Sequence, residues 1–492
     1  MTADVHFELL WPEFLVAGLA FVIFTLDFFL RPERKNILAW VSVIGLAGIL
    51  AFTIPYLMNE NDSLFNGLYR VDDYALFFKV LSMAIGGAVI LGSIHFVGRY
   101  LTHPGEYYAI ILLSVLAMMM MAASGELLTA YLSLELLSFC LYILSGFALH
   151  DSKSNEASVK YILLGAFSSG LLLYGIVMLY GALGTTSFAE MAVALEGIED
   201  IDGRLLIGLT LLISGLGFKM AAVPFHMWAP DVYEGAPMPI TAYIAVGSKV
   251  AAFALVLRLF AEGLLPAIDQ WNVLIAGLAA LTMLFGNLVA LAQTNVKRML
   301  AYSSVGQVGF LLMGIASLST LSSNGLMVHL VGYSATNLAV FFAITAFYNV
   351  TGKEDIVDFA GLAGRSPFLA AAITVSLFSL AGLPFLAGFV TKFYLFSAAA
   401  AEDLLWLAGV AMVASLISLY YYLNVVRQMY ISPAADGEEG AIKVPNLLYG
   451  LVGVLVIIVI LLGVYPEPLV NIIENATDVI LPAADAAALN LP

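Results

Sequence analysis

The chain has 492 residues, of which 62% are hydrophobic and only 11% are charged. Soluble domains average about 25% charged residues, so this composition excludes an ordinary soluble domain and indicates an integral membrane protein. The net charge of −16 excludes a nucleic-acid binder. The single cysteine, Cys140, excludes a disulfide within the chain and a four-cysteine zinc or iron–sulfur site. We therefore expect this chain to bind no cofactor and no metal.

Apolar runs of about 20 residues recur along the whole chain and predict an all-α polytopic membrane protein, whose spans are helices and not the strands of a barrel. Residues 1–7 contain no lysine or arginine and include Asp4, so we interpret the first run as a permanent helix and not as a cleaved signal peptide. The fourteen predicted spans are 11–30, 37–58, 74–97, 106–124, 127–149, 159–181, 204–223, 239–260, 273–292, 298–318, 325–349, 367–398, 405–429 and 445–465. Residues 188–196 are expected to form a short surface helix.

Two of the predicted spans contain a break. The seventh runs into Pro224, and the twelfth contains Pro384 and is too long for one straight crossing. A proline inside a helix removes one backbone hydrogen bond and collides with the carbonyl four residues earlier. Broken spans at matching positions of two halves are typical of transporters with internal repeats, and an odd number of spans per repeat inverts the second copy. The predicted single membrane domain, 1–492, then has a three-helix segment over 1–105, five-helix repeats over 106–260 and 273–429, and a final helix over 445–465.

Lysine and arginine are distributed unevenly between the two sides of the membrane. One set of connections holds twelve of the 19: Arg31, Arg34, Lys35, Arg99, Lys153, Lys160, Lys297, Arg298, Lys353, Arg365, Arg427 and Lys443. The other set holds three: Arg70, Arg204 and Arg258. Cytoplasmic loops carry an excess of these residues, so we predict that both termini lie on the outer side.

The remaining four of the 19, Lys79, Lys219, Lys249 and Lys392, lie inside predicted spans. A charged side chain at a helix centre costs roughly 2.5–3.5 kcal/mol even on lenient scales, and it is rarely kept there without a function. Removal from water also makes a lysine give up its proton more readily, which suits a proton pathway. Glu135 is the only acid in its apolar run, and we predict that it pairs with Lys219 and controls whether that lysine keeps its proton.

Other polar residues in the spans are expected to complete a relay. His226 lies between Lys219 and Lys249 in the sequence. Four residues of the tenth span are expected to pass protons towards Lys392 together with ordered water: Tyr302, Ser303, Ser304 and Gln307.

Structural roles are the alternative for several of these residues. Lys79 is expected to extend to the lipid headgroups, and Lys160 is either a charge that sets the topology or a member of the pathway. Glu135 and Lys219 are alternatively a fixed ion pair between two helices. His329 is interpreted as a hydrogen-bonding residue between helices and not as a relay.

Five stretches carry distinctive motifs: GLGFKMAAVPFHMWAPDVYEGAP at 215–237, GSKVAAF at 247–253, AQTNVKRMLAYSSVGQVG at 292–309, TGKEDIVDFAGLAGRSP at 351–367 and AGLPFLAGFVTKFYLF at 381–396. They resemble the family of N chains of bacterial NADH-quinone oxidoreductase, respiratory complex I, over essentially the whole length. The PDVYEGAP motif and the lysine at 392 resemble N chains more than their sister M chains, in which a glutamate is typical at that place. Sister L chains end in a lateral helix, for which we expect no counterpart after residue 465.

The resemblance implies an antiporter-like fold and a redox-inert subunit of a proton-translocating NADH:quinone oxidoreductase in the bacterial plasma membrane. NADH, FMN, iron–sulfur clusters and quinone are then held by partner subunits, and the partners are the other membrane chains of the complex. The implied proton pathway consists of Glu135, Lys160, Lys219, His226, Lys249, Tyr302 and Lys392.

Three alternatives stay open at this point: a subunit of a multi-chain sodium/proton antiporter, a subunit of a membrane-bound hydrogenase, and a structural scaffold with fixed ion pairs. The sequence also leaves open the electron donor, the type of quinone, the proton stoichiometry and a thylakoid location.

Overall fold

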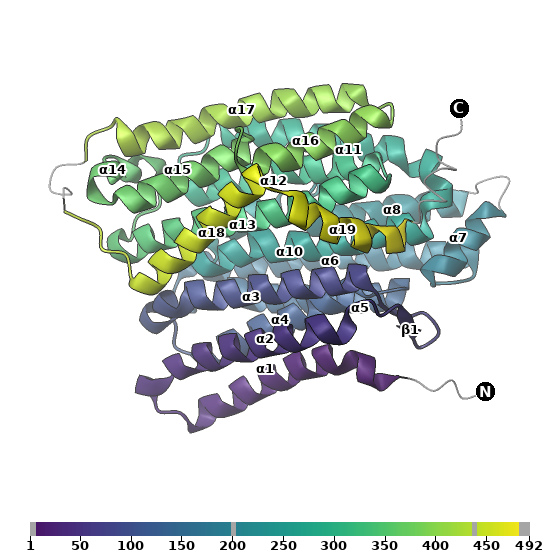
Figure 1. The fold of residues 1–492 in the computed structure, drawn as a ribbon, viewed down its shortest axis with the longest axis horizontal. Coiled ribbons are helices and arrows are strands. Elements are labelled where there is room, and N and C mark those ends of the chain that lie inside the picture. The colour runs from purple at the N-terminus through teal and green to yellow at the C-terminus, as the bar shows by residue number, and fades with distance from the viewer. Residues whose placement is uncertain (1–5, 198–202, 435–439, 482–492) are drawn as a thin grey trace.

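A computed structural model describes residues 6–197, 203–434 and 440–481, and within them the chain is almost entirely helical (Figure 1). The N-terminal segment contains α1 (Trp11–Phe29), α2 (Asn36–Leu57), β1 (Asp62–Leu64), β2 (Tyr69–Val71) and α3 (Asp73–Tyr100). It is followed by α4 (Pro104–Ala122), α5 (Leu127–Ser145), α6 (Ser152–Leu183), α7 (Phe188–Glu196), α8 (Gly203–Met220), α9 (Trp228–Gly235) and α10 (Met238–Arg258). The remaining helices are α11 (Ile268–Ala290), α12 (Val296–Ala316), α13 (Thr320–Thr351), α14 (Leu362–Arg365), α15 (Pro367–Ala381), α16 (Ala387–Ala401), α17 (Leu405–Tyr430), α18 (Asn446–Val464) and α19 (Glu467–Ile480).

Thirteen helices in the described part are long and apolar enough to cross a membrane. They correspond to the predicted spans except for the twelfth, which consists of the two shorter apolar helices α15 and α16. The predicted count of fourteen crossings therefore depends on whether this pair together makes one crossing. The predicted surface helix is present as α7, with the predicted bounds.

Both predicted breaks are present. Helix α8 ends at Met220, and Pro224 lies in the turn before α9. Helix α15 ends at Ala381, and the chain passes Gly382, at φ 90°, and Pro384 before α16 begins. The positive φ of Gly382 is a backbone conformation that side chains with a Cβ rarely adopt. Each break exposes backbone carbonyls inside the protein, where polar side chains can use them.

Two segments of the chain share the same local structure. Helices α6 and α13 both have 32 residues and both end at a glycine with positive φ. In each segment the chain after that glycine pairs with the N-cap of an earlier helix: Ser187 bridges to Glu126, and Asp355 bridges to Asn295. The C-terminal end of α6 leads to α7 at the right of Figure 1, whereas α13 leads to α14 at the left. We propose on this basis that α4–α10 and α11–α17 are inverted copies.

The buried centre of the molecule consists of three helices. All of the most apolar window of α10 is buried, as is 94% of the window in α12 and in α13, against 33% in α1, α2 and α17. A buried helix can hold charged side chains only where neighbouring helices supply partners. The polar residues on α10, α12 and α13 are therefore candidates for a functional site.

Two described elements were not predicted from the sequence. The chain between α2 and α3 forms a two-stranded antiparallel hairpin, in which Ser63 pairs with Arg70. These short strands lie in a connection, and the membrane-crossing segments are helical as predicted. After α18, helix α19 packs on α3 and α13 with its apolar side, which includes Val470, Ile473 and Ile480. Its 14 residues are too few to cross a membrane. A hydropathy scan for long apolar runs cannot find such a short amphipathic helix.

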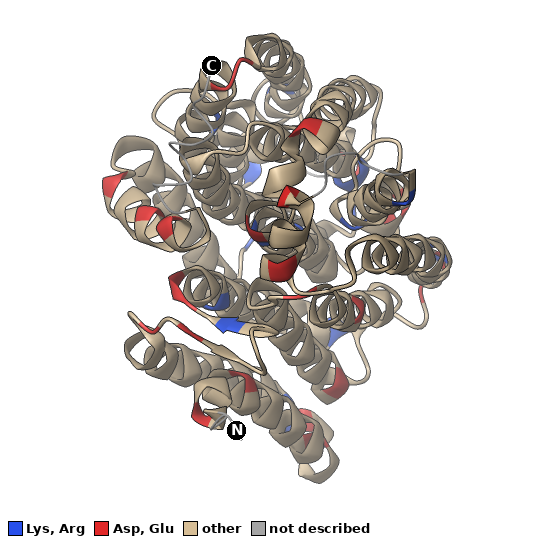
Figure 2. Cartoon of the chain, turned by 90° about the vertical axis from the view of Figure 1, so that its right-hand side faces the viewer, with Lys and Arg blue, Asp and Glu red and all other residues tan. Residues whose placement is uncertain are grey.

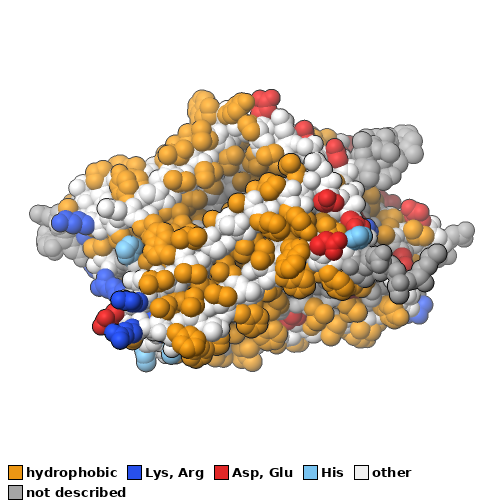
Figure 3. All heavy atoms as spheres, turned by 60° about the horizontal axis from the view of Figure 1, so that its bottom comes forward, with side chains coloured by type: hydrophobic (Ala, Val, Ile, Leu, Met, Phe, Trp, Pro, Cys, Tyr) orange, Lys and Arg blue, Asp and Glu red, His pale blue; other side chains and the backbone are white. Residues whose placement is uncertain are grey.

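Basic side chains are concentrated at one end of the molecule and acidic side chains at the other. Figure 3 shows hydrophobic side chains along the flank, most Lys and Arg at the left end, and most Asp and Glu at the right end. The described chain begins with α1 and ends after α19 at the right end (Figure 1), and Figure 2, which faces that end, shows acidic residues on many of its loops and helix ends. The separation agrees with the loop census of the sequence, and we propose from it that the termini lie outside.

Candidate functional site

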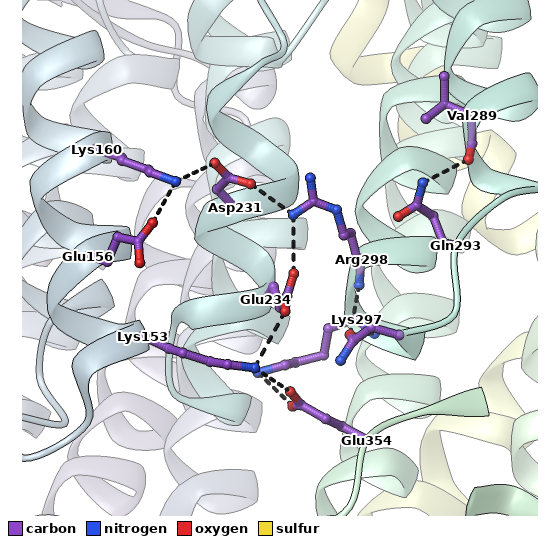
Figure 4. A network of polar contacts seen from close by, with 11 residues as sticks. Lys153, Glu156, Lys160, Asp231, Glu234, Val289, Gln293, Lys297, Arg298 and Glu354 are labelled. Atoms are coloured by element: carbon purple, nitrogen blue, oxygen red, sulfur yellow. Dashed lines mark hydrogen bonds and ion pairs between the residues drawn. The ribbon is translucent and has the colours of Figure 1, made fainter. Parts of the chain in front are cut away.

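A row of ion pairs lies where α6 and α12 begin, and Figure 4 shows its members. Lys160 of α6 lies 2.7 Å from Glu156, one turn earlier, and 2.8 Å from Asp231 of α9. Residues four apart on a helix are neighbours on its surface, which explains the first pair. Asp231 in turn accepts a hydrogen bond of 2.8 Å from Arg298 of α12. The row therefore joins the first proposed repeat to the second.

The same row continues beyond Arg298, as Figure 4 shows. Arg298 also lies 3.1 Å from Glu234, which is 3.4 Å from Lys153. Lys153 is 3.6 Å from Glu354, whose second oxygen lies 3.0 Å from Lys297. Positive and negative groups alternate throughout. They form most of the lining of a pocket of about 190 Å³ and part of the lining of a second pocket of about 450 Å³. This arrangement places eight charged groups of alternating sign next to one another where α6 and α12 begin.

The predicted pair of Glu135 and Lys219 is present. Lys219 Nζ lies 3.1 Å from Glu135 Oε1, and the side chains are 9% and 15% exposed. Ser169 donates a hydrogen bond of 2.6 Å to the same oxygen of Glu135. Lys219 also donates to Ser138 at 2.8 Å and to Ser169 at 3.1 Å. The ammonium therefore has hydroxyl partners that remain in place if the carboxylate moves away or becomes protonated.

Lys249 begins a chain of hydroxyl groups at the centre of the molecule. Its side chain is buried on α10, and Nζ donates a hydrogen bond of 2.7 Å to the Tyr233 hydroxyl. That hydroxyl lies 3.4 Å from Ser304 Oγ, which is 2.7 Å from the Tyr333 hydroxyl. Groups that both donate and accept hydrogen bonds can pass a proton along such a chain.

Lys392 uses the break between α15 and α16. Its Nζ donates to the carbonyl of Leu380 at 2.8 Å, within the last turn of α15. A cavity of about 10 Å³ is lined by Lys392, Tyr333, His329 and Gln307, among others. This volume is close to the smallest space that holds one water molecule. Tyr333 thus borders both the hydroxyl chain from Lys249 and the cavity of Lys392.

Some sequence-predicted residues lie elsewhere than expected. Among the described contacts Lys160 belongs to the row of ion pairs and makes no contact with the Glu135 pair. The His226 ring lies 6.4 Å from the Tyr302 ring, so Tyr302 is beside the α8–α9 break. Ser303 is hydrogen-bonded to Tyr422. The four residues predicted to form one relay, at 302, 303, 304 and 307, therefore contact different parts of the protein, because successive residues of a helix face different neighbours.

The expected roles of the other buried residues also differ in part. Lys79 does not extend to the lipid headgroups: its side chain is fully buried and lies 2.9 Å from Glu13 Oε1. That expectation was wrong because Glu13 of α1, distant in sequence, supplies the opposite charge. Arg258, which the sequence placed among the charges of the outer connections, is also buried and pairs with Asp72. His329 contacts Thr391 across two helices, as expected of a residue that joins helices.

Sequence reasoning missed most of the polar site. The missed residues are Lys153, Glu156, Asp231, Glu234, Lys297, Arg298 and Glu354 in the row of ion pairs, and Tyr233 and Tyr333 in the hydroxyl chain. The only available signal was the motif PDVYEGAP, which contains Asp231, Tyr233 and Glu234. In the described residues no group of three or more His, Cys, Asp or Glu side chains is arranged to hold a metal ion.

Comparisons with known proteins agree in their result. A family model described as "NADH:quinone oxidoreductase/Mrp antiporter, TM" matches residues 124–418. The NADH-quinone oxidoreductase subunit N of Moorella thermoacetica is 43% identical over 477 residues, covering 96% of this chain and 98% of the relative. A chain of respiratory complex I from Thermus thermophilus with bound Aureothin is 28% identical, with a TM-score of 0.78, covering 94% of this chain and 98% of that one. A chain of the Mrp complex from a Dietzia species is 20% identical, with a TM-score of 0.83, covering 97% and 99%, and is similar in fold alone.

Proposed function

This chain belongs to the family of NADH:quinone oxidoreductase and Mrp antiporter membrane subunits, and from that membership we propose the route by which it moves protons. Its relatives at 40–43% identity are N subunits of NADH-quinone oxidoreductase, and the chain is a proton-pumping membrane subunit of respiratory complex I. It works within a multi-subunit assembly. The sodium/proton antiporter alternative is not favoured, since the Mrp chain resembles this one in fold alone.

The proposed route begins at the row of ion pairs that contains Lys160. Protons pass from there to Lys219, where Glu135 compensates the charge, and then to Lys249. His226 and Tyr302 form a side branch of the route at the break between α8 and α9.

From Lys249 the proton follows Tyr233, Ser304 and Tyr333 to the cavity of Lys392. The observation that carries this proposal is the continuous series of hydrogen bonds from Lys249 to Tyr333, which borders that cavity. A series of this kind lets a proton cross between the two proposed repeats without a charged group leaving its place.

The chain itself has no role in electron transfer under this proposal. Its part in the enzyme is translocation, while NADH, FMN, iron–sulfur clusters and quinone are bound by partner subunits. The membrane is the bacterial plasma membrane, with the row of ion pairs on the cytoplasmic side and both termini outside. The excess of Lys and Arg at the end opposite to the termini supports this orientation.

Replacing Glu135 with glutamine is expected to reduce proton pumping about tenfold, because a neutral partner no longer changes the affinity of Lys219 for its proton. Glutamine keeps the size of the side chain and can still accept from Ser169. Pumping is measured as donor-driven proton uptake by membrane vesicles, after a native gel has shown an intact complex. Glu135→Asp keeps the charge and is the matched control. Native pumping in the intact glutamine variant would mean that the ion pair is fixed and structural.

Replacing Tyr333 with phenylalanine tests the hydroxyl chain, and the proposed route depends on the result. The change keeps the ring but removes the hydroxyl, so proton pumping is expected to fall about tenfold, with the complex still assembled. The same vesicle assay measures the effect. Tyr420→Phe, at an exposed tyrosine of α17 that has no described contact with the site, is the control and should pump normally. If both variants pump equally well, protons do not cross between the repeats at this place.

A further inference from the structure

A second buried lysine–carboxylate pair lies outside the proposed route. Lys79 of α3 and Glu13 of α1 are 2.9 Å apart, with side chains 0% and 7% exposed. Glu13 is the third residue of α1, and Lys79 lies six residues, about 9 Å, into α3. Both positions are near the end of the molecule that carries the termini, next to the β1–β2 hairpin (Figure 1).

The contacts of this pair repeat those of the pair on the proposed route. Tyr69 donates a hydrogen bond of 2.6 Å to the Glu13 oxygen that faces Lys79, and Lys79 Nζ lies 5.3 Å from the centre of the Tyr69 ring. At Glu135 and Lys219, a hydroxyl also donates to the carboxylate at 2.6 Å, and the ammonium lies 5.9 Å from a tyrosine ring. Both sites therefore contain a lysine, a carboxylate that accepts from a hydroxyl, and a tyrosine ring beside the ammonium. They differ in that Lys219 also donates to that hydroxyl, whereas Lys79 Nζ has no hydrogen-bond partner among the described residues.

A cluster of further charges surrounds the pair. Arg258, at the end of α10, lies 2.6 Å from Asp72 and 3.0 Å from Glu262. Burial acts to raise the pKa of Asp72, but Arg258 and, to a smaller extent, Lys79 lower it below the usual range. The remaining ionisable groups of the cluster are Arg70, Tyr69 and Tyr74. The pair is thus electrostatically connected to α10, the helix that carries Lys249.

A contribution to the stability of the fold does not by itself explain why Glu13 and Lys79 are buried as an ion pair. Burying two charges costs about as much as their attraction returns, so apolar residues of similar size often serve equally well. The second carboxylate oxygen of Glu13 has no hydrogen-bond partner among the described residues. Burial and the Glu13 carboxylate raise the pKa of Tyr69 well above its usual range, so that Tyr69 remains a donor. The free oxygen of Glu13 is then the one available to take a proton.

We propose that Glu13 and Lys79, oriented by Tyr69, form a second proton-holding site near the end that carries the termini, and that this site acts in proton release. Transfer of one proton from the Lys79 ammonium to the Glu13 carboxylate leaves a neutral amine and a neutral carboxylic acid. The acid then loses this proton to the outer side, and a proton from the route restores the ammonium. The inference rests on the proposed function, since the route supplies the proton.

The test uses the assembled complex in membrane vesicles. Glu13→Gln is expected to lose most of the donor-driven proton pumping while a native gel shows an intact complex. Asp27→Asn is the matched control, because Asp27 lies on the same helix and pairs with Lys35 at 2.9 Å near the other end. This control should pump normally. Equal pumping by both variants would overturn the proposal.

A double variant distinguishes proton transfer from a structural role. Glu13→Gln alone leaves the Lys79 ammonium buried without its opposite charge, which by itself could prevent assembly, whereas the double variant leaves no unpaired charge. The double variant Glu13→Gln with Lys79→Met should assemble and still lose pumping. Normal pumping by it would show that the pair is structural. If Lys249→Ala stops pumping and Glu13→Gln does not, this site is wrong and the proposed route stands. If Glu13→Gln alone stops pumping, the route through Lys249 is wrong, and the proton reaches Glu13 and Lys79 by a path that does not include Lys249.

Discussion

Replacing Lys249 with alanine is expected to lower the rate of proton pumping by about 100-fold. This factor is at the lower end of the rate enhancement that a positioned proton-transfer group provides. The Tyr233 hydroxyl is the hydrogen-bond partner of Lys249 in the described structure, so the change removes the start of the hydroxyl chain. Donor-driven quinone reduction should fall together with pumping, because the two processes are coupled in the complex. Both are measured in membrane vesicles, after a native gel has shown that the complex is intact.

The alanine variant should assemble, which makes the result interpretable. Among the described contacts no carboxylate pairs with Lys249, so its removal leaves no buried charge without a partner. Ser248→Ala is the matched control, since Ser248 is the preceding residue and bonds only to its own helix at Ile244. Unchanged pumping and quinone reduction in an intact Lys249→Ala complex would show that the central lysine is structural and that the route is wrong.

The opposite outcome is expected for Arg258, whose replacement with methionine should prevent stable assembly. Its guanidinium lies 2.6 Å from Asp72 and 3.0 Å from Glu262, and its side chain is fully buried. Without it two carboxylates remain buried with no cation between them, and breaking such a buried pair costs about 3–5 kcal/mol. The amount of assembled complex on a native gel and its thermal stability measure the effect.

A compensating variant shows whether charge is the cause. Asp72→Asn can still accept the hydrogen bond from the Ala75 backbone N–H that caps α3, and Glu262→Gln keeps the size of the side chain. Combined with Arg258→Met, these two changes remove Arg258 together with both carboxylates that it pairs with, and should restore most of the assembly. If Arg258→Met alone assembles as well as the native chain, the carboxylates are not held by Arg258 in the way that the structure describes.

The sequence by itself determined the membrane character and most of the helices. Apolar runs of sufficient length must form helices in a membrane, because no water is available for unpaired backbone groups. The prolines at 224 and 384 located the two breaks, since proline cannot continue the hydrogen bonding of a helix. The pairing of Glu135 with Lys219 was also predictable, because each is an ionisable residue in an apolar run and each needs an opposite charge.

The tertiary structure alone decided which charged residues are functional candidates and which partners they have. Asp72 and Arg258 are 186 residues apart and Tyr69 and Glu13 are 56 apart, yet each pair is in direct contact. Residues counted as loop charges, such as Lys153 and Arg298, became members of one alternating row. Local apolarity predicts that a segment is a helix but not how the helix is rotated or which neighbour it faces. Those choices follow from packing among many helices, and they decide whether a buried charge finds a partner.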